Sequence, residues 1–309
     1  MSSSNGSNIK SKSSARKAAL GKAAESFMRY LVRRVGGKSP AQVEQMGRRY
    51  GQLMWSFAGK RRQRTRENLR LAFPNRDSRE IEQIARGVFI HFGRTSMDFL
   101  AGANRTKEEI EATTHIQGLE HLDAALAKGK GALLITGHLG NWERVSAWLS
   151  LSGYPLNVIA RDADDEGVNS IVNEIRKRPG TKVISRGQAA RQVLLKLRGN
   201  EIVGILPDQN ASDIFIPFFG VPAGTALGPG VFQSRTQATV VPVACVYNAT
   251  NRYTMTFYPP LEPHQPETSP GEGLMRAINA WLEDRIRETP EQWLWMHDRW
   301  RNARRKGLI

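Results

Sequence analysis

Cysteine and long apolar runs are scarce in this sequence, and both absences restrict what the protein can be. One cysteine, Cys245, among 309 residues excludes an internal disulfide and is typical of a reducing compartment. It lies in the apolar run 239–247 without a basic neighbour, so we expect a buried structural thiol. No stretch of 18 apolar residues is present, and the N-terminus lacks an apolar signal segment. The sequence therefore predicts neither a transmembrane helix nor secretion.

Several motifs that carry common chemistries are also missing. The chain has no Gly-x-Ser-x-Gly, Gly-x-x-x-x-Gly-Lys or Gly-x-Gly-x-x-Gly segment, which excludes the usual α/β-hydrolases, NTPases and dinucleotide-binding enzymes. Four histidines have no ligand-like spacing to one another or to acidic residues: His91, His115, His121 and His264. We therefore expect no metal site.

Positive charge is concentrated at the front of the chain. The net charge is +16, and residues 1–66 hold 16 lysines and arginines against only Glu25 and Glu44, so residues 67–309 carry only +2. A segment of this charge attracts polyanions, among them anionic membranes and nucleic acids. The near-neutral body and the absence of zinc-finger or RNP motifs argue against nucleic acid as a partner. A basic polyanion-binding protein remains the alternative from another class.

The first third of the sequence has a helical pattern. Residues 1–22 are rich in serine and lysine and predict a disordered basic tail. Helices are predicted at 23–35, 40–57, 78–100 and 107–112, from apolar residues at helical spacing or from helix-capping residues. In the first of these helices, arginines occupy much of the face that the apolar residues leave. Amphipathic helices of this kind lie on an anionic membrane, pack on the rest of the protein, or do both. We predict a helical, membrane-proximal region at 23–112.

Short apolar runs separated by helical patterns characterise the rest of the chain. Strands are expected at 131–136, 156–160, 201–206, 239–247 and 253–258, and helices at 118–128, 142–152, 167–178, 188–198 and 270–288. This alternation is typical of an α/β fold with a largely parallel central sheet flanked by helices. We assign 113–309 to an α/β domain, and 23–309 could also form one domain.

Polar residues follow three of the predicted strands. In open α/β sheets, ligands bind beyond the carboxyl ends of the strands. His138, Arg161 and Asp208 follow the first three strands and are expected at that edge. Each by itself could equally be a solvated loop residue.

The segment after the first strand suggests acid–base chemistry. Gly140 permits a tight turn, and Asn141 caps the following helix, so that Glu143 lies in the first helical turn. From there its carboxylate could reach one ring nitrogen of His138, leaving the other nitrogen to take a proton from a hydroxyl. In the alternative, the histidine merely ends a strand and the glutamate interacts only with the helix dipole.

A family resemblance decides between these readings. Gly137–Glu143 matches the His-x4-Asp/Glu motif of the lysophospholipid acyltransferase superfamily, and the chain resembles its lipid A late acyltransferase branch (lauroyl/myristoyl acyltransferases), which also holds phosphatidylinositol mannoside acyltransferases. Further matching segments, which extend the resemblance over about 25–305, are Arg66–Pro74, Asp208-Gln209, Phe218-Phe219-Gly220 with Thr225 and Gly228, Val241–Val243 and Pro290–His297.

The resemblance implies an O-acyltransferase. The acyl chain would come from an acyl carrier protein or coenzyme A thioester as co-substrate, and it would pass to a lipid-linked hydroxyl without cofactor, metal or acyl-enzyme. It favours a lipid A precursor as the acceptor; a phosphatidylinositol mannoside or a lysophospholipid is the alternative. The expected place is the cytoplasmic face of the inner membrane, with peripheral attachment through the basic front segment.

The resemblance also assigns roles to individual residues. His138 would be the general base, oriented by Glu143. Arg176 matches the branch's arginine downstream of the motif, although Arg161 or Arg178 could take that place, and Asp208 matches its strand-end aspartate. With Thr225, which lies in a matching loop, Arg161, Arg176 and Asp208 form the candidate substrate-binding set. An arginine suits a phosphate-rich acceptor because its planar fork binds two oxygens at once.

Overall fold

A seven-stranded sheet forms the centre of the computed structural model, which describes residues 5–160, 166–185, 187, 189–248 and 253–309. The strand order is β1-β9-β8-β2-β5-β3-β4. The strands are β1 (Thr114–Gln117), β2 (Ala132–Ile135), β3 (Leu156–Ala160), β4 (Lys182–Ser185), β5 (Ile202–Ile205), β8 (Thr239–Tyr247) and β9 (Tyr253–Phe257). All neighbouring pairs are parallel except β8 and β9. The predicted α/β class is confirmed.

The two central strands explain why the sequence pattern was readable. Every residue of β2 and β5 is buried, and strands covered on both faces appear as uninterrupted apolar runs. The hairpin of β6 (Ile214–Phe218) and β7 (Val221–Thr225) forms a separate antiparallel pair that the sequence pattern did not predict. Cys245 is fully buried in β8, as expected, and burial raises the pKa of its thiol to about 12.

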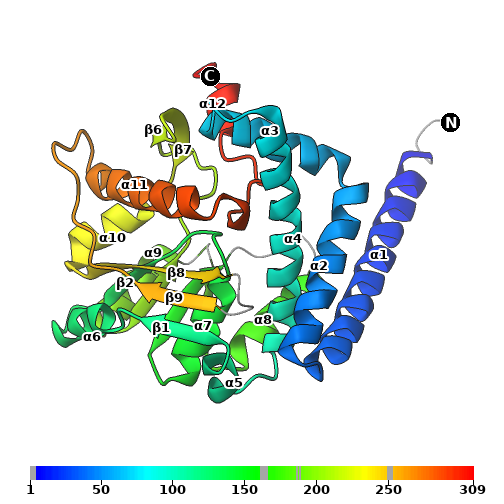
Figure 1. Cartoon of the computed structure of the whole chain (residues 1–309), viewed down its shortest axis with the longest axis horizontal. Coiled ribbons are helices and arrows are strands. Elements are labelled where there is room, and N and C mark those ends of the chain that lie inside the picture. The colour runs from blue at the N-terminus through cyan, green and yellow to red at the C-terminus, as the bar shows by residue number, and fades with distance from the viewer. Residues whose placement is uncertain (1–4, 161–165, 186, 188, 249–252) are drawn as a thin grey trace.

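Helices cover both faces of the sheet (Figure 1). Leu133 and Ile135 of β2 pack in one core cluster with α9 (Ala189–Arg198) and α11 (Glu272–Glu288), and α10 (Gly228–Thr236) lies against both helices. Leu134, which points to the opposite face, packs with α6 (Glu120–Ala127) and α7 (Trp142–Leu151). The carboxyl ends of β2 and β5 lie between these two layers.

Five helices precede the sheet: α1 (Asn5–Gly36), α2 (Pro40–Phe57), α3 (Gly59–Ala72), α4 (Ser78–Gly102) and α5 (Lys107–Glu111). Figure 1 shows α2 alongside α4, and glycines make this close contact possible. A Cβ atom at Gly51 would lie 2.3 Å from the carbonyl oxygen of Phe89, and one at Gly93 would lie 2.2 Å from that of Gly47. Ala85, Val88 and Phe89 of α4 also belong to the core cluster that holds Leu133 and Ile135 of β2.

The N-terminal segment is more regular than expected. The predicted disorder of residues 1–22 is wrong from Asn5 onward, where α1 begins. Alanine and lysine in this stretch have high helix propensity, and they extend a helix that is anchored at its other end. There Val35 is buried in a cluster with Ile171 of α8 (Glu166–Lys177). Residues 1–4 lie outside the described residues.

The change from helices to strands falls between α5, which ends at Glu111, and β1, which begins at Thr114. Whether the two parts are separate domains stays a prediction. Among the described residues, no helix is long and apolar enough to cross a membrane.

Candidate active site

His138 lies at the carboxyl end of β2, in the turn that leads into α7. Gly140 has a φ of +61°, and a Cβ atom there would lie 2.1 Å from the Cys245 carbonyl oxygen, so this turn requires glycine. Asn141 caps α7 by accepting a hydrogen bond from the backbone N–H of Arg144 at 3.1 Å. The predicted strand–turn–helix arrangement is confirmed, and it leaves 19% of the His138 side chain exposed.

A carboxylate does hold this imidazole, but it is that of Asp208. Nδ1 of His138 lies 2.7 Å from Oδ1 of Asp208, and the backbone N–H of His138 donates to Oδ2 at 2.6 Å. The indole N–H of Trp293 donates to Oδ2 as well, at 2.8 Å. The expected bond from Glu143 to His138 is therefore corrected. Because β2 and β5 are adjacent and parallel, the residue that follows β5 meets the ring instead.

The pair has a defined protonation pattern. Burial by itself would raise the pKa of Asp208, but the charge and hydrogen bonds of His138 outweigh burial and lower that pKa to about 2. An ionised carboxylate only accepts hydrogen bonds, so the neutral ring carries its proton on Nδ1 and keeps a lone pair on Nε2. The side-chain amide of Gln209 donates to Nε2 at 3.3 Å. The arrangement can accept a proton from a hydroxyl group at Nε2.

A small cavity opens beside the imidazole, between α4 and residues 292–294. Its walls are largely apolar and include Val88 and Phe92. The His91 ring also lines it, with Nε2 3.1 Å from the Gly140 carbonyl oxygen, and burial lowers the pKa of His91 to about 4. At neutral pH this second histidine is therefore uncharged, and the cavity next to His138 is largely apolar.

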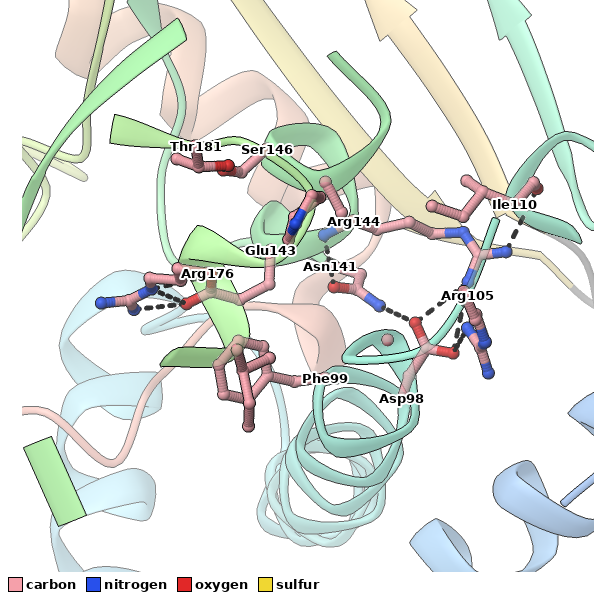
Figure 2. Close-up of a pocket in the computed structure, with 14 residues that line it drawn as sticks. Asp98, Phe99, Arg105, Ile110, Asn141, Glu143, Arg144, Ser146, Arg176 and Thr181 are labelled. Carbon is pink, nitrogen blue, oxygen red and sulfur yellow. Dashed lines mark hydrogen bonds and ion pairs between the residues drawn. The ribbon is translucent and has the colours of Figure 1, made fainter. Parts of the chain in front are cut away.

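Glu143 points into a different cavity, where it binds Arg176 of α8 (Figure 2). The Nε atom of Arg176 lies 3.0 Å from Oε2 and its Nη2 atom lies 2.5 Å from Oε1. Burial would lower the pKa of Arg176, but the charge of Glu143 outweighs this effect and raises it. The Trp142 indole, whose ring centroid is 4.9 Å from that of His138, also donates to Glu143 at 3.2 Å. Trp142 thus lies between the two predicted catalytic side chains.

The remaining predicted residues have different positions. Arg161 lies outside the described residues. Arg178 pairs with Glu174 at the surface, at 2.8 Å. Thr225 is fully buried at the end of β7, where its hydroxyl donates to the Ala223 carbonyl oxygen at 3.0 Å. The structure thus gives Thr225 a place in the core rather than on a substrate surface, because β7 pairs with β6 and turns this side chain inward.

Comparisons with known proteins fit this site. The model of a family described as bacterial lipid A biosynthesis acyltransferase matches residues 26–302. The chain is 27% identical to a lipid A biosynthesis acyltransferase of Haemophilus influenzae over 77% of this chain and 75% of that protein. It is 24% identical to a lipid A biosynthesis palmitoleoyltransferase of Escherichia coli, over 83% of this chain and 84% of that protein. A phosphatidylinositol mannoside acyltransferase of Mycobacterium tuberculosis is 29% identical, over 60% of this chain and 59% of that protein.

The chain belongs to the bacterial lipid A biosynthesis acyltransferase family. It is an acyltransferase, as the relatives' names and the resemblance in its motifs agree.

Sequence reasoning missed a buried charge network that fixes the first turn of α7 in this acyltransferase. Asp98 of α4 accepts hydrogen bonds from the Asn141 amide at 2.6 Å and from Arg144 at 3.0 Å, and it also pairs with Arg105 (Figure 2). Burial opposes ionisation of Asp98, but the two arginines outweigh it and lower its pKa. The network ties the helix that carries Glu143 to α4. In the sequence, nothing distinguishes these charged residues from the solvent-exposed charges of other segments, so the network could not be predicted.

The segment after α11 contains the short helices η2 (Pro290–Gln292) and α12 (Arg301–Arg305), and Pro290–His297 is one of its stretches that match the family pattern. It contacts the loops that carry His138 and Asp208. The backbone N–H of Leu294 donates to the His138 carbonyl oxygen at 3.0 Å, and the Gln292 carbonyl oxygen accepts from Gly140 at 2.9 Å. The His297 ring accepts from the backbone N–H of Asn210 at 3.0 Å. The match of Pro290–His297 to the family pattern was the feature of the sequence that could have indicated these contacts.

Proposed function

We propose that this acyltransferase moves a fatty acyl chain from the thioester of acyl carrier protein or coenzyme A to a hydroxyl of a lipid acceptor. The observation that carries the proposal is the His138–Asp208 pair at 2.7 Å beside a largely apolar cavity. A lipid A precursor is the first candidate acceptor, which the relatives named as lipid A acyltransferases support. The phosphatidylinositol mannoside acyltransferases, 29% identical over 60% of the chain, support a mannoside as the second candidate.

In this mechanism the acceptor hydroxyl replaces the Gln209 amide at Nε2 of His138. The nitrogen takes the hydroxyl proton while the oxygen attacks the thioester carbonyl carbon and a C–O bond forms. The tetrahedral intermediate then breaks its C–S bond. The imidazolium, stabilised by Asp208, returns its proton to the leaving thiolate, so that the ring ends the cycle neutral. A positioned base of this kind contributes roughly 10²–10⁴-fold in rate.

The Glu143–Arg176 pair is placed on the acceptor side of the site in this proposal. Its two side chains are only 12% and 21% exposed, and the carboxylate balances the guanidinium charge. A phosphate group of the acceptor would bind to the free edge of Arg176, with Glu143 fixing the orientation of that guanidinium. Arg161 stays a second candidate for the same phosphate.

We also propose that the enzyme binds the cytoplasmic face of the inner membrane peripherally, through α2. Tyr50, Leu53 and Phe57 form an exposed apolar stripe, the α2 stripe, with exposed fractions of 37%, 57% and 81%. Their spacing of three and four residues places them on one helix face. Exposed basic residues flank the stripe in the sequence: Arg48, Arg49, Lys60 and Arg61. No acidic residue occurs between Glu44 and Glu67, so the charge of this face is complementary to anionic lipid.

The test uses the purified full chain with defined substrates. Acyl carrier protein and coenzyme A thioesters are each offered with a lipid A precursor, a phosphatidylinositol mannoside or a lysophospholipid, and products are identified by mass spectrometry. We expect an acceptor heavier by one acyl group, with the lipid A precursor preferred. Absence of acylated lipid from every pair would contradict the proposal, and acyl transfer to water would indicate a hydrolase.

A further inference from the structure

Arg299 is a buried cation that pairs with no carboxylate among the residues that the structure describes. It is fully buried, and its guanidinium donates to the carbonyl oxygen of Gly224, to the Thr225 hydroxyl at 2.8 Å and to the Gln209 carbonyl oxygen at 3.4 Å. The Phe218 ring lies 5.2 Å from its central carbon, and Nε has no partner within the described part of the chain. All of these partners are uncharged. Because burying an uncompensated charge is costly, a residue of this kind calls for a reason beyond packing.

The charge that compensates Arg299 belongs to Asp208, in the loop that Arg299 contacts. Burial lowers the pKa of Arg299 to about 10, and the charge that opposes this shift is that of Asp208. The guanidinium also binds the carbonyl oxygen of Gln209, which is the residue next to Asp208. Arg299 therefore stays protonated at neutral pH and shares one buried environment with the aspartate.

The groups around His138 show what this charge can do. Asp208 bonds to Nδ1, and the Gln209 amide faces Nε2. His91 lines the neighbouring cavity. Burial lowers the pKa of His91 and the pKa of His297 to about 4 each, so both rings are uncharged at neutral pH. The charge of Glu143 is balanced by Arg176.

Asp208 is then the ionised group that contacts the ring, and Arg299 is the cation bound to the same loop, at the Gln209 carbonyl oxygen. An aspartate alone stabilises the imidazolium, and a ring that is already protonated accepts no proton. A nearby cation has the opposite effect on the ring.

We infer that Arg299 is a positioning residue of the active site, whose buried charge offsets that of Asp208 and keeps His138 neutral while the orienting hydrogen bond stays in place. That the neutral ring serves as the base in acyl transfer rests on the proposed function. The electrostatic effect of Arg299 on His138 is independent of that function, and it is measurable without turnover.

The test compares Arg299→Gln, which keeps hydrogen-bonding atoms but loses the charge, with Arg299→Lys, which keeps the charge. NMR titration of the full-length protein with labelled histidine, assigned with a His138→Gln variant, gives the imidazole pKa of His138. We expect Arg299→Gln to raise that pKa by about 1 unit, because one neighbouring charge is removed. Arg299→Lys and the exposed-site control Arg301→Gln should leave it near the wild-type value. The acid limb of the kcat/KM profile should move to higher pH by the same amount.

An unmoved His138 titration in a folded Arg299→Gln variant would overturn the inference, even if activity falls. Should Arg299→Gln not fold, Arg299→Met removes the charge without burying an amide, and the same shift is required of it. A wild-type protein that shows the expected titrations but transfers no acyl chain would contradict only the proposed function. Normal transfer with unmoved titrations would contradict only the role of Arg299.

Discussion

His138 and Asp208 are 70 residues apart in the sequence, yet Nδ1 of one and Oδ1 of the other are 2.7 Å apart. They follow adjacent parallel strands, β2 and β5, so that the sheet itself brings them together. A second bond, from the His138 backbone N–H to Oδ2 at 2.6 Å, fixes the position of the carboxylate relative to the main chain. This double attachment makes Asp208 the group that sets the orientation and tautomer of the ring.

Replacement of Asp208 should therefore cost more activity than replacement of Glu143. In Asp208→Asn the amide can donate to Nδ1, which favours the tautomer that is protonated at Nε2 and cannot act as a base. We expect kcat to fall about 10²–10⁴-fold while the far-UV circular dichroism stays unchanged. Glu143→Gln is the matched control, with a smaller expected loss. Equal activity of Asp208→Asn and wild type would refute the orienting role.

The same carboxylate predicts a pH dependence of stability. The folded pKa of Asp208, about 2, lies below its ordinary value, so its contribution is present above pH 4 and is lost as the pH falls toward 2. A difference of this size corresponds to roughly 2 kcal/mol of unfolding free energy. Urea unfolding at pH 6 and at pH 2.5 should show a smaller acid-induced loss of stability for Asp208→Asn than for wild type. Parallel losses in both proteins would contradict the assignment.

His138→Ala should abolish acyl transfer without unfolding the protein. The side chain is 19% exposed and packs at the rim, so its removal leaves the core clusters intact. His91→Gln is a useful comparison, since His91 lines the same cavity but is held by the Gly140 carbonyl oxygen. Activity of His138→Ala within about tenfold of wild type would be too high for the loss of a general base.

The fold was predictable where one residue type dominated a segment. The four buried apolar residues of β2 predicted a central strand, and Gly140 with Asn141 predicted the turn and cap that follow it. The segment β4 was not predicted, because it has four residues of which one is buried. The helix α3 was missed for a similar reason: its basic residues hide the short apolar face that includes Leu69.

The partner of His138 was not predictable from spacing. Glu143 is five residues away and Asp208 is 70 residues away, so nearness in sequence favoured the wrong carboxylate. The order of strands decides the matter, and a single sequence does not reveal that β5 lies beside β2. The role of Thr225 could not be foreseen either, because it depends on the pairing of β6 with β7 and on the guanidinium of Arg299.

The contact between Glu143 and Arg176 predicts that the two side chains act as one unit. Either single variant, Glu143→Gln or Arg176→Met, leaves a partly buried charge without its partner and should lower kcat/KM for a phosphorylated acceptor. The double variant should lose little more than the worse single one, with a coupling energy of about 1–3 kcal/mol. A double-mutant cycle on kcat/KM measures this coupling. Fully additive losses would mean that the residues act separately.

Membrane attachment through the α2 stripe is testable at two positions that have no structural role. Leu53 and Phe57 are 57% and 81% exposed, so the double variant Leu53→Gln/Phe57→Gln should leave the unfolding midpoint unchanged. It should weaken binding to vesicles containing phosphatidylglycerol by about 10–100-fold, because two apolar side chains no longer enter the bilayer interface. Co-sedimentation measures the partition.

The control for this experiment lies on another helix. Leu195 of α9 is 55% exposed and lies on a helix other than the one that carries the α2 stripe, so Leu195→Gln should bind vesicles like wild type. Raising the salt concentration should weaken binding of the wild type and of both variants, since the exposed basic residues attract anionic lipid through screened charges. If Leu195→Gln and the stripe variant lose binding equally, attachment is not through α2. If neither loses binding while high salt releases all three proteins, the basic residues attach the enzyme by charge alone and the stripe inserts nowhere.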